Sequence, residues 1–187
     1  MSTDRVREVM DVVDRRWFLP EDQHDRAHED APLPIGHGAT CSQPTTVVHM
    51  LDALDAGPGH HVLDVGSGSG WTTALLAHLV APGGTVVGVE LEPDLARSGA
   101  ENLRRAGVPG AQIHPARAGV LGRPEDGPYD RVLVSAESAE VPHELVEQLA
   151  DPGRMVIPVA GRLLVIDRDA QGTSTTELGR YRFVPLR

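Results

Sequence analysis

Apolar and polar residues alternate along this chain in blocks that predict strands and helices in turn. Short apolar runs predict strands, and longer stretches with apolar residues three or four positions apart predict helices. From residue 61 onward the predicted elements are strand 61–65, helix 72–80, strand 85–90, helix 94–106, strand 111–115, strand 130–136, helix 143–150 and strand 154–159. This alternation is typical of a mostly parallel sheet with helices on both faces.

The first part of the chain has a different pattern. Val6, Met10 and Val13 share one face of a predicted helix over residues 5–16. The stretch 19–34 that follows is poor in apolar residues and rich in Asp, Glu, His and Pro. We therefore expect a surface loop or a moving lid there.

The last part of the chain predicts an antiparallel pair of strands. Residues 162–168 and 175–184 read as two strands on either side of a turn, so a β-hairpin is expected to close the sheet. The whole pattern predicts an α/β fold with a doubly wound, mostly parallel seven-stranded sheet and a C-terminal antiparallel β-hairpin. No internal repeat or linker divides the chain, so we expect one domain over residues 1–187.

Composition narrows the function. With 187 residues and 40% hydrophobic content, the chain can bury one sizeable core. Its net charge of −10 argues against a nucleic-acid partner, because phosphate binding needs a basic surface. The 17 basic residues are all arginine, which excludes a Schiff-base or Walker-type lysine. Nine histidines are present, but none has convincing ligand spacing, and we expect no metal site.

Cysteine usage and targeting signals indicate the compartment. Cys41 is the single cysteine, so no internal disulfide can form, and a small apolar filler beneath a loop is its expected role. No apolar stretch reaches membrane-spanning length, and the first residues do not resemble a signal peptide. We expect a cytoplasmic monomer that depends on a small molecule.

A glycine loop follows the strand predicted at residue 61. Asp64 comes two residues before the first glycine of G-x-G-x-G, formed by Gly66, Gly68 and Gly70. A dinucleotide fingerprint needs G-x-G-x-x-G, and its third glycine would fall on the bulky Trp71. The pattern instead resembles that of S-adenosylmethionine-dependent methyltransferases. Trp71 is thus the residue that argues against a nicotinamide dehydrogenase.

Glu90 supports a nucleoside ligand. It ends the apolar run 86–89, where a carboxylate can accept hydrogen bonds from both ribose hydroxyls. The resemblance therefore implies S-adenosyl-L-methionine as the cofactor and S-adenosyl-L-homocysteine as its product, on a Rossmann-like fold. Asp64 has two open roles, in shaping the turn and in contacting Ser42 or the cofactor side.

A second motif precedes the core. Residues 32–44 read P-L-P-I-G-H-G-A-T-C-S-Q-P, an extended loop that runs into a helix. Ser42 is the natural N-cap of that helix, and capping alone would explain it. The whole string, however, resembles the signature loop of protein-L-isoaspartate O-methyltransferases, P-L-P-I-G-x-G-x-T-I-S-x-P. In that family the loop covers the methyl donor and its serine contacts the substrate carboxylate.

The resemblance implies specific site residues. Ser42 is expected to be the catalytic residue that orients the substrate carboxylate. The expected cofactor-binding residues are Ala39, Thr40, Ser42, Asp64, Gly66, Ser67, Gly68, Glu90, Leu91 and Ala118. Residues 1–44 would form the N-terminal helix and active-site loop of a single methyltransferase domain, and residues 45–187 its Rossmann-like core. The implied partner is a peptide or protein that bears isoaspartate or aspartate.

Four further stretches resemble the family in order along the chain. Residues 16–20 resemble R-x-x-F-V-P, and 128–130 match P-Y-D. Residues 148–159 resemble Q-L-x-x-G-G-R-L-V-x-P-V, and 181–186 resemble the closing V-R-F-V-P-L. Together with the loop that carries the serine, these make five separate matches, which are far more specific than one glycine loop.

Two positions depart from the family pattern. Where the family has G-D-G-x-x-G after the third core strand, this chain has Ala118 in place of the acid that helps to hold the adenine. Glu137 follows the fourth core strand, where small residues are usual, and would repel a substrate carboxylate if it faced the site. These differences leave three alternatives open: methylation of isoaspartate as protein repair, methylation of a normal aspartate in a dedicated peptide, and a cofactor-binding relative with little turnover.

Overall fold

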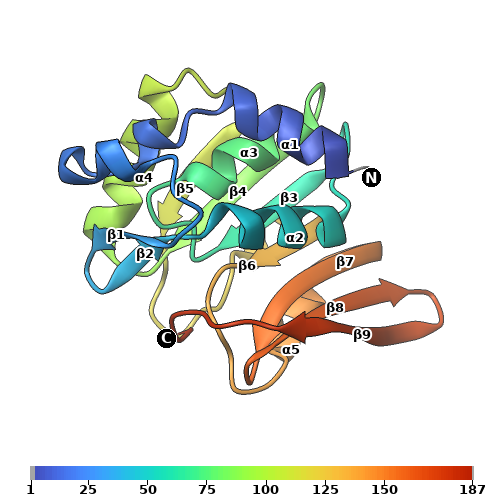
Figure 1. Cartoon of the computed structure of the whole chain (residues 1–187). Coiled ribbons are helices and arrows are strands. Elements are labelled where there is room, and N and C mark those ends of the chain that lie inside the picture. Colours follow the sequence, from blue (N-terminus) through green and yellow to red (C-terminus); the bar gives the residue numbers. More distant parts are fainter. Residues whose placement is uncertain (1–2, 187) are drawn as a thin grey trace.

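A seven-stranded sheet runs through the middle of the molecule (Figure 1). The computed structural model describes residues 3–186. The strands of the sheet are β3 (His61–Val65), β4 (Thr85–Glu90), β5 (Ala111–Pro115), β6 (Tyr129–Val134), β7 (Leu149–Val159), β8 (Arg162–Asp169) and β9 (Gly172–Arg180). Their order is β5-β4-β3-β6-β7-β8-β9, with five parallel strands followed by the antiparallel β8 and β9. The predicted fold class and C-terminal hairpin are confirmed.

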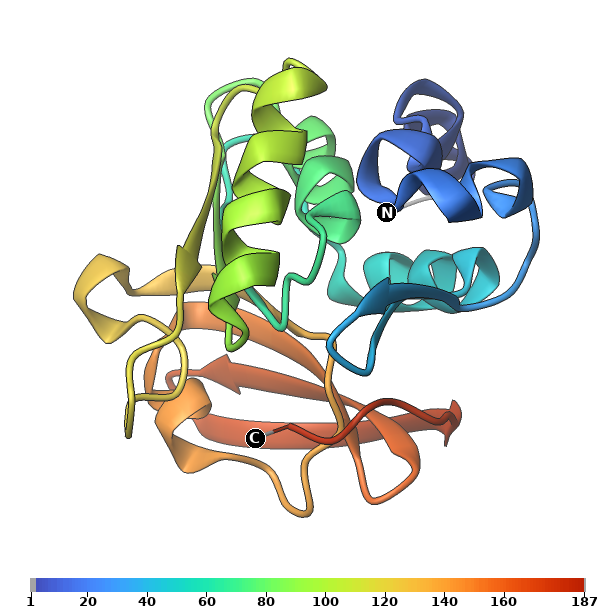
Figure 2. The ribbon, with the colours of Figure 1, turned by 90° about the vertical axis from the view of Figure 1, so that its left-hand side faces the viewer.

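Helices cover the two faces of this sheet unequally. The helices are α1 (Thr3–Val12), α2 (Pro44–Leu54), α3 (Trp71–Val80), α4 (Pro93–Arg105) and α5 (His143–Glu147). Helices α2, α3 and α4 pack on one face, where α1 lies against α2 and α3, and α5 lies on the other face (Figures 1 and 2). Alternate residues of β3 divide accordingly, because successive side chains of a strand point to opposite faces: Val62 joins the core under α1–α4 and Leu63 joins the core under α5.

Strand register brings the carboxyl ends of β3, β4 and β6 to one edge. In the parallel ladders Val65 lies opposite Val89 of β4 and Val134 of β6. The chain runs outward from β3 to β5 on one side and from β6 to β7 on the other, so the strand order reverses between β3 and β6. Open α/β sheets bind ligands outside the carboxyl ends of their strands at such a switch point.

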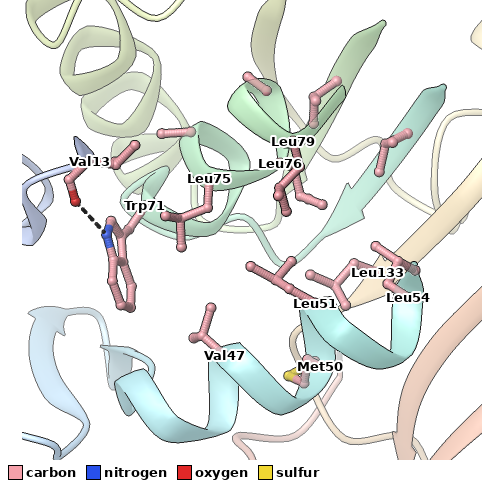
Figure 3. Packing of buried hydrophobic residues seen from close by; sticks show 14 of the residues in the cluster. Val13, Val47, Met50, Leu51, Leu54, Trp71, Leu75, Leu76, Leu79 and Leu133 are labelled. Carbon is pink, nitrogen blue, oxygen red and sulfur yellow. Dashed lines mark hydrogen bonds between the residues drawn. The ribbon is translucent and has the colours of Figure 1, made fainter. Parts of the chain in front are cut away.

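Helix α3 connects this edge to the rest of the core. Figure 3 shows Val47 and Leu51 of α2 facing Leu75 and Leu76 of α3 across the apolar interior. At the first position of α3, Trp71 turns toward the N-terminal region, and its indole nitrogen donates to the carbonyl of Val13 at 3.4 Å. The glycine loop is thus followed directly by Trp71, which holds the segment around Val13.

Helix α4 approaches the glycine loop closely through one glycine. Leu95, Ala96, Gly99 and Leu103 form the buried face of α4 at helical spacing. A Cβ atom on Gly99 would lie 2.8 Å from the carbonyl oxygen of Gly68 and 3.0 Å from a methyl group of Ile113. The helix can therefore lie against the loop only with a hydrogen at this position.

The predicted boundaries of four elements are wrong. The first helix ends at Val12, not at residue 16, and a 3₁₀ turn (η1, Arg15–Phe18) follows it. Helix α5 ends at Glu147, so the predicted 143–150 is too long, and β7 begins at Leu149 rather than 154. Strand β9 spans Gly172–Arg180, so the stretch predicted as 175–184 leaves the sheet after residue 180.

The segment between η1 and the core is not a plain loop. A second 3₁₀ helix, η2, covers Glu21–Arg26, and the strands β1 (Leu33–Gly36) and β2 (Ala39–Cys41) form a small antiparallel sheet. Phe18 is buried, whereas Trp17 is 46% exposed and its ring lies beneath the guanidinium of Arg105.

Residues 3–186 contain neither a candidate membrane-spanning helix nor a candidate metal-binding cluster. No helix there is long and apolar enough to cross a membrane. Nor do histidine, cysteine and acidic side chains gather in that part of the chain in a group of three or more that could hold a metal ion.

Gly99→Ala tests the close packing of α4. The added methyl group must displace the Gly68 carbonyl, so we expect the free energy of unfolding to fall by about 1 to 3 kcal/mol, despite the higher helix propensity of alanine. Chemical denaturation measures this change. Ser98→Ala is the control, because Ser98 is the exposed neighbour on the same helix. Equal stability of the two variants would contradict the packing described.

Candidate functional site

A cavity of about 560 Å³ lies at the carboxyl edge of the parallel strands. Its walls come from the β1–β2 hairpin, the glycine loop after β3, the end of β4, the segment after β5, the end of β6 and the C-terminal segment. Its lining includes Ile35, Ala39, Thr40, Ser42, Gly66, Ser67, Gly68, Glu90, Leu91, Ala116–Gly122, Ser135, Ala136, Glu144 and Val184–Leu186. Nine of the ten residues predicted at the cofactor line this one cavity; the tenth, Asp64, does not.

The glycine loop and Glu90 form one hydrogen-bonded unit. Gly66 and Gly68 both have positive φ, which L-residues with a side chain rarely adopt. The Gly68 N–H donates to Glu90 Oε2 at 2.8 Å, and the Glu92 N–H donates to Glu90 Oε1 at 3.0 Å. Each carboxylate oxygen keeps a free lone pair, because an oxygen of this group accepts about two hydrogen bonds. The carboxylate is therefore held in place and can still accept two hydroxyl groups.

Asp64 lies beneath this loop and not in the cavity. Its side chain is fully buried, and its Oδ2 accepts a hydrogen bond from Thr73 Oγ1 of α3 at 2.6 Å. Oδ1 has no partner. Burial raises the pKa of Asp64 from 3.8 to about 7; the nearby Glu90 also raises it, and the Thr73 hydrogen bond opposes the rise. Of the two roles left open for Asp64, this geometry favours shaping the turn.

Ser42 is not the N-cap of α2, contrary to expectation. The helix begins at Pro44, and its N-cap is Gln43, whose side chain makes no capping bond. Asp30 takes the capping role from a distant loop: its Oδ1 accepts from the Thr45 N–H at 2.8 Å and its Oδ2 from Thr45 Oγ1 at 2.7 Å. These bonds lower the pKa of Asp30. The Ser42 hydroxyl is left to line the cavity, with no hydrogen bond within residues 3–186.

The backbone at Ser42 is held by Arg15. This arginine is 5% exposed, and its Nη2 donates to the carbonyl oxygens of Ala31, Cys41 and Ser42 at 2.8, 3.0 and 2.9 Å. Nη1 donates to the carbonyl of Glu29 at 3.0 Å. Carbonyl dipoles thus replace water around a buried cation. Because these carbonyls lie on both sides of the β1–β2 hairpin, one guanidinium holds the hairpin and its flanks together.

Arg15 also joins the hairpin to the glycine loop. Its guanidinium carbon lies 5.0 Å from the ring centroid of Trp71, the first residue of α3. Arg15 was not among the residues predicted from the sequence, in which Arg16 was matched to the family arginine. Arg16 is exposed and pairs with Asp14. The spacing R-x-x-F, counted back from Phe18, falls on Arg15 and was the signal that could have found it.

Of the two positions that depart from the family pattern, only Ala118 lines the cavity. Ala118 lines the cavity and offers no polar side chain. Glu137 is not among the lining residues; its backbone bonds with the C-terminal segment, donating to Val184 and accepting from Leu186, both at 2.7 Å. The charge of Glu137 therefore does not line the cavity. Cys41 is buried as predicted, and burial raises the pKa of its thiol.

Comparison with known proteins shows the family to which the chain belongs. The model of the protein-L-isoaspartate(D-aspartate) O-methyltransferase family (PCMT) matches residues 1–187. The chain belongs to this family. Among its relatives, a protein-L-isoaspartate O-methyltransferase of Methanopyrus kandleri is 44% identical over 191 residues, covering 100% of this chain and 84% of that protein. The enzyme of the same name from Methanocella arvoryzae is 42% identical over 180 residues and covers 95% of both chains.

Solved structures of the protein-L-isoaspartate O-methyltransferase family share the fold. A putative protein-L-isoaspartate O-methyltransferase from Plasmodium falciparum, in complex with S-adenosyl-L-homocysteine, superimposes with a TM-score of 0.85 at 28% identity, over 98% of this chain and 90% of that one. A second structure, named protein-L-isoaspartate O-methyltransferase, gives a TM-score of 0.90 at 24% identity over 98% of this chain and 61% of that one. The family resemblance seen in the sequence is confirmed.

Arg15→Lys tests the carbonyl cage. A lysine ammonium is a compact donor that cannot reach carbonyls on both sides of the hairpin at once. We expect the free energy of unfolding to fall by about 2 to 3 kcal/mol, because buried carbonyls lose their donors. Arg16→Lys, at the exposed neighbour, is the matched control and should change stability little. If denaturant titration gave the same loss for both variants, the cage would not hold the hairpin.

Asp64→Asn tests the buried carboxyl. A folded-state pKa of about 7 against 3.8 means that the folded protein holds a proton that the unfolded chain has lost. This contribution to stability is complete below pH 3.8 and disappears as the pH rises through about 7. Relative to that of the asparagine variant, the free energy of unfolding of the wild type should fall by about 2.5 kcal/mol as the pH rises from about 5 to about 8. A difference between the two proteins that does not change with pH would show that Asp64 titrates normally.

Proposed function

We propose that this protein transfers the methyl group of S-adenosyl-L-methionine to the free carboxylate of L-isoaspartyl residues in peptides and proteins. One observation carries the proposal: the unpaired Ser42 hydroxyl and the Gly68–Glu90 unit line the same cavity. The first suits a substrate carboxylate and the second suits a nucleoside. An enzyme that joins the two substrates needs both groups within one cavity, so that the reacting atoms can meet.

The donor half of the site fits a nucleoside that carries a charged tail. Glu90 offers lone pairs to two ribose hydroxyls, and the glycine loop lets the ligand approach the backbone closely. Ser67 adds a buried hydroxyl that has no partner within residues 3–186. A buried polar atom without a partner is costly, and a ligand that bonds it removes that cost.

The acceptor half needs little acid–base help. A peptide carboxylate has a pKa near 3.5, so it is already ionised at neutral pH. The Ser42 hydroxyl donates a hydrogen bond to one carboxylate oxygen and leaves the other free to attack. Bound S-adenosyl-L-methionine supplies an electrophilic methyl group on a sulfonium. The new carbon–oxygen bond forms as the carbon–sulfur bond breaks, and S-adenosyl-L-homocysteine and a methyl ester leave.

The ester explains why the reaction serves repair. A methyl ester has a better leaving group than a carboxylate, so after release from the enzyme the neighbouring backbone nitrogen bonds to the ester carbonyl carbon, the carbon–methoxy bond breaks, methanol leaves, and a succinimide forms. Hydrolysis of the succinimide returns part of the material as normal aspartate. We place this activity in the cytoplasm, which suits a chain whose single cysteine is a buried thiol, and we propose that the protein acts as a monomer.

Ser42→Ala tests the acceptor half. Without the hydroxyl the carboxylate is no longer oriented, and we expect kcat/KM for an isoaspartyl peptide to fall about 100-fold. Calorimetry should find the affinity for S-adenosyl-L-homocysteine changed by less than about threefold, because one neutral hydrogen bond contributes little. Ser174→Ala on the exposed strand β9 is the control. Unchanged methylation by Ser42→Ala would contradict the proposed role.

Matched isoaspartyl and aspartyl peptides with labelled donor decide the substrate. We expect label only in the isoaspartyl peptide. Methylation of the aspartyl form alone would assign the enzyme to a normal aspartate, the alternative raised by Ala118 and Glu137. Donor binding with neither peptide labelled would indicate a relative with little turnover.

A further inference from the structure

The cavity extends beyond Glu90 to the segment that follows β5. Gly66–Gly68, Glu90 and Ala116–Gly122 follow the ends of β3, β4 and β5, which are consecutive neighbours in the sheet. Adjacent strands lie about 4.8 Å apart, so the last segment is about 10 Å from the glycine loop. A nucleoside whose ribose is bound at Glu90 therefore extends its base toward residues 116–122.

This end of the cavity is nearly without acceptor side chains. Arg117 is the only residue of Ala116–Gly122 with a polar side chain, and it pairs with Glu125 at 2.6 Å. A guanidinium can donate hydrogen bonds but cannot accept them. Glu144 lines the same cavity from α5; the residue is exposed, and its carboxylate has no ion-pair or hydrogen-bond partner within residues 3–186.

The position of Glu144 is set by a buried glutamine. Gln148 is 7% exposed, and its Nε2 donates to the carbonyls of Leu121 and Glu144 at 2.9 and 2.8 Å. Its Oε1 accepts from the Arg123 N–H at 2.9 Å. A Cβ atom at Gly122 would lie only 2.5 Å from that same Oε1. The first turn of α5 is thus held directly against the segment where the base lies.

We propose that Glu144 recognises the amino-bearing edge of the purine base of the methyl donor. This inference rests on the proposed function, which identifies the ligand as an adenosine derivative. The exocyclic amine at position 6 donates to the Glu144 carboxylate, a charge-assisted bond that Ala118 cannot make. A 6-oxo base presents an acceptor there, and two acceptors repel one another. Glu144 thereby makes the site selective for adenine over hypoxanthine.

Calorimetric titration of the whole protein with two ligands tests this role. S-adenosyl-L-homocysteine and S-inosyl-L-homocysteine differ only in the base. The first has an amino group at position 6, and the second has an oxo group there and therefore a proton on the neighbouring ring nitrogen. The wild type should bind the adenosyl compound at least about 30-fold more tightly. Glu144→Gln should reduce that ratio about 10-fold or more, because an amide can also donate to the 6-oxo group. Adding Ala118→Asp to Glu144→Gln should restore the preference.

The control is Glu147→Gln, which removes an exposed charge from the same helix outside the cavity. It should leave both affinities as in the wild type. An unchanged affinity ratio in Glu144→Gln, with adenosyl binding intact, overturns the role of Glu144 and leaves the proposed function standing. A wild type that binds neither ligand overturns both.

Discussion

The arrangement of this protein depends on one buried cation that is bound by backbone carbonyls instead of by a carboxylate. Arg15 donates to carbonyls on both flanks of the β1–β2 hairpin and stacks on Trp71, the residue that begins α3. A guanidinium can satisfy several carbonyls at once, because its donors point in fixed directions in one plane. The hairpin that carries Ser42 is therefore held relative to the helix that begins at the glycine loop. The two halves proposed for the site, for acceptor and donor, therefore share one support.

The sheet provides the second constraint. The carboxyl ends of β3, β4 and β5 present the glycine loop, Glu90 and the segment after β5 in a row, so an extended ligand crosses three neighbouring strands. The C-terminal segment, bonded to Glu137, closes the cavity from the side of β6. Methyl transfer requires alignment and exclusion of water more than proton transfer. A rigid edge with a supported hairpin provides both.

Patterns within short stretches of sequence predicted the glycine loop and the acid that ends the next strand. The glycine spacing and the acid at the end of a strand identified the loop and Glu90, because each feature lies within one strand and its turn. Ser42 was expected to cap α2 because serine at that place usually does, but Asp30 supplies the cap from a loop whose path no periodicity reveals. Arg15 was missed for the same reason: its partners are up to 27 residues away. Ser42 lines the cavity and is not the N-cap, and its catalytic role, which the family motif implies, stays a prediction.

The most direct measurement of the central claim is a crystal structure of the protein with S-adenosyl-L-homocysteine and an isoaspartyl peptide. The account predicts a carboxylate oxygen of the peptide about 2.6 to 3.0 Å from Ser42 Oγ, with the ribose hydroxyls on Glu90. The two ligands should meet inside the cavity between these residues. A peptide carboxylate bound away from Ser42, or a nucleoside that does not contact Glu90, would contradict it.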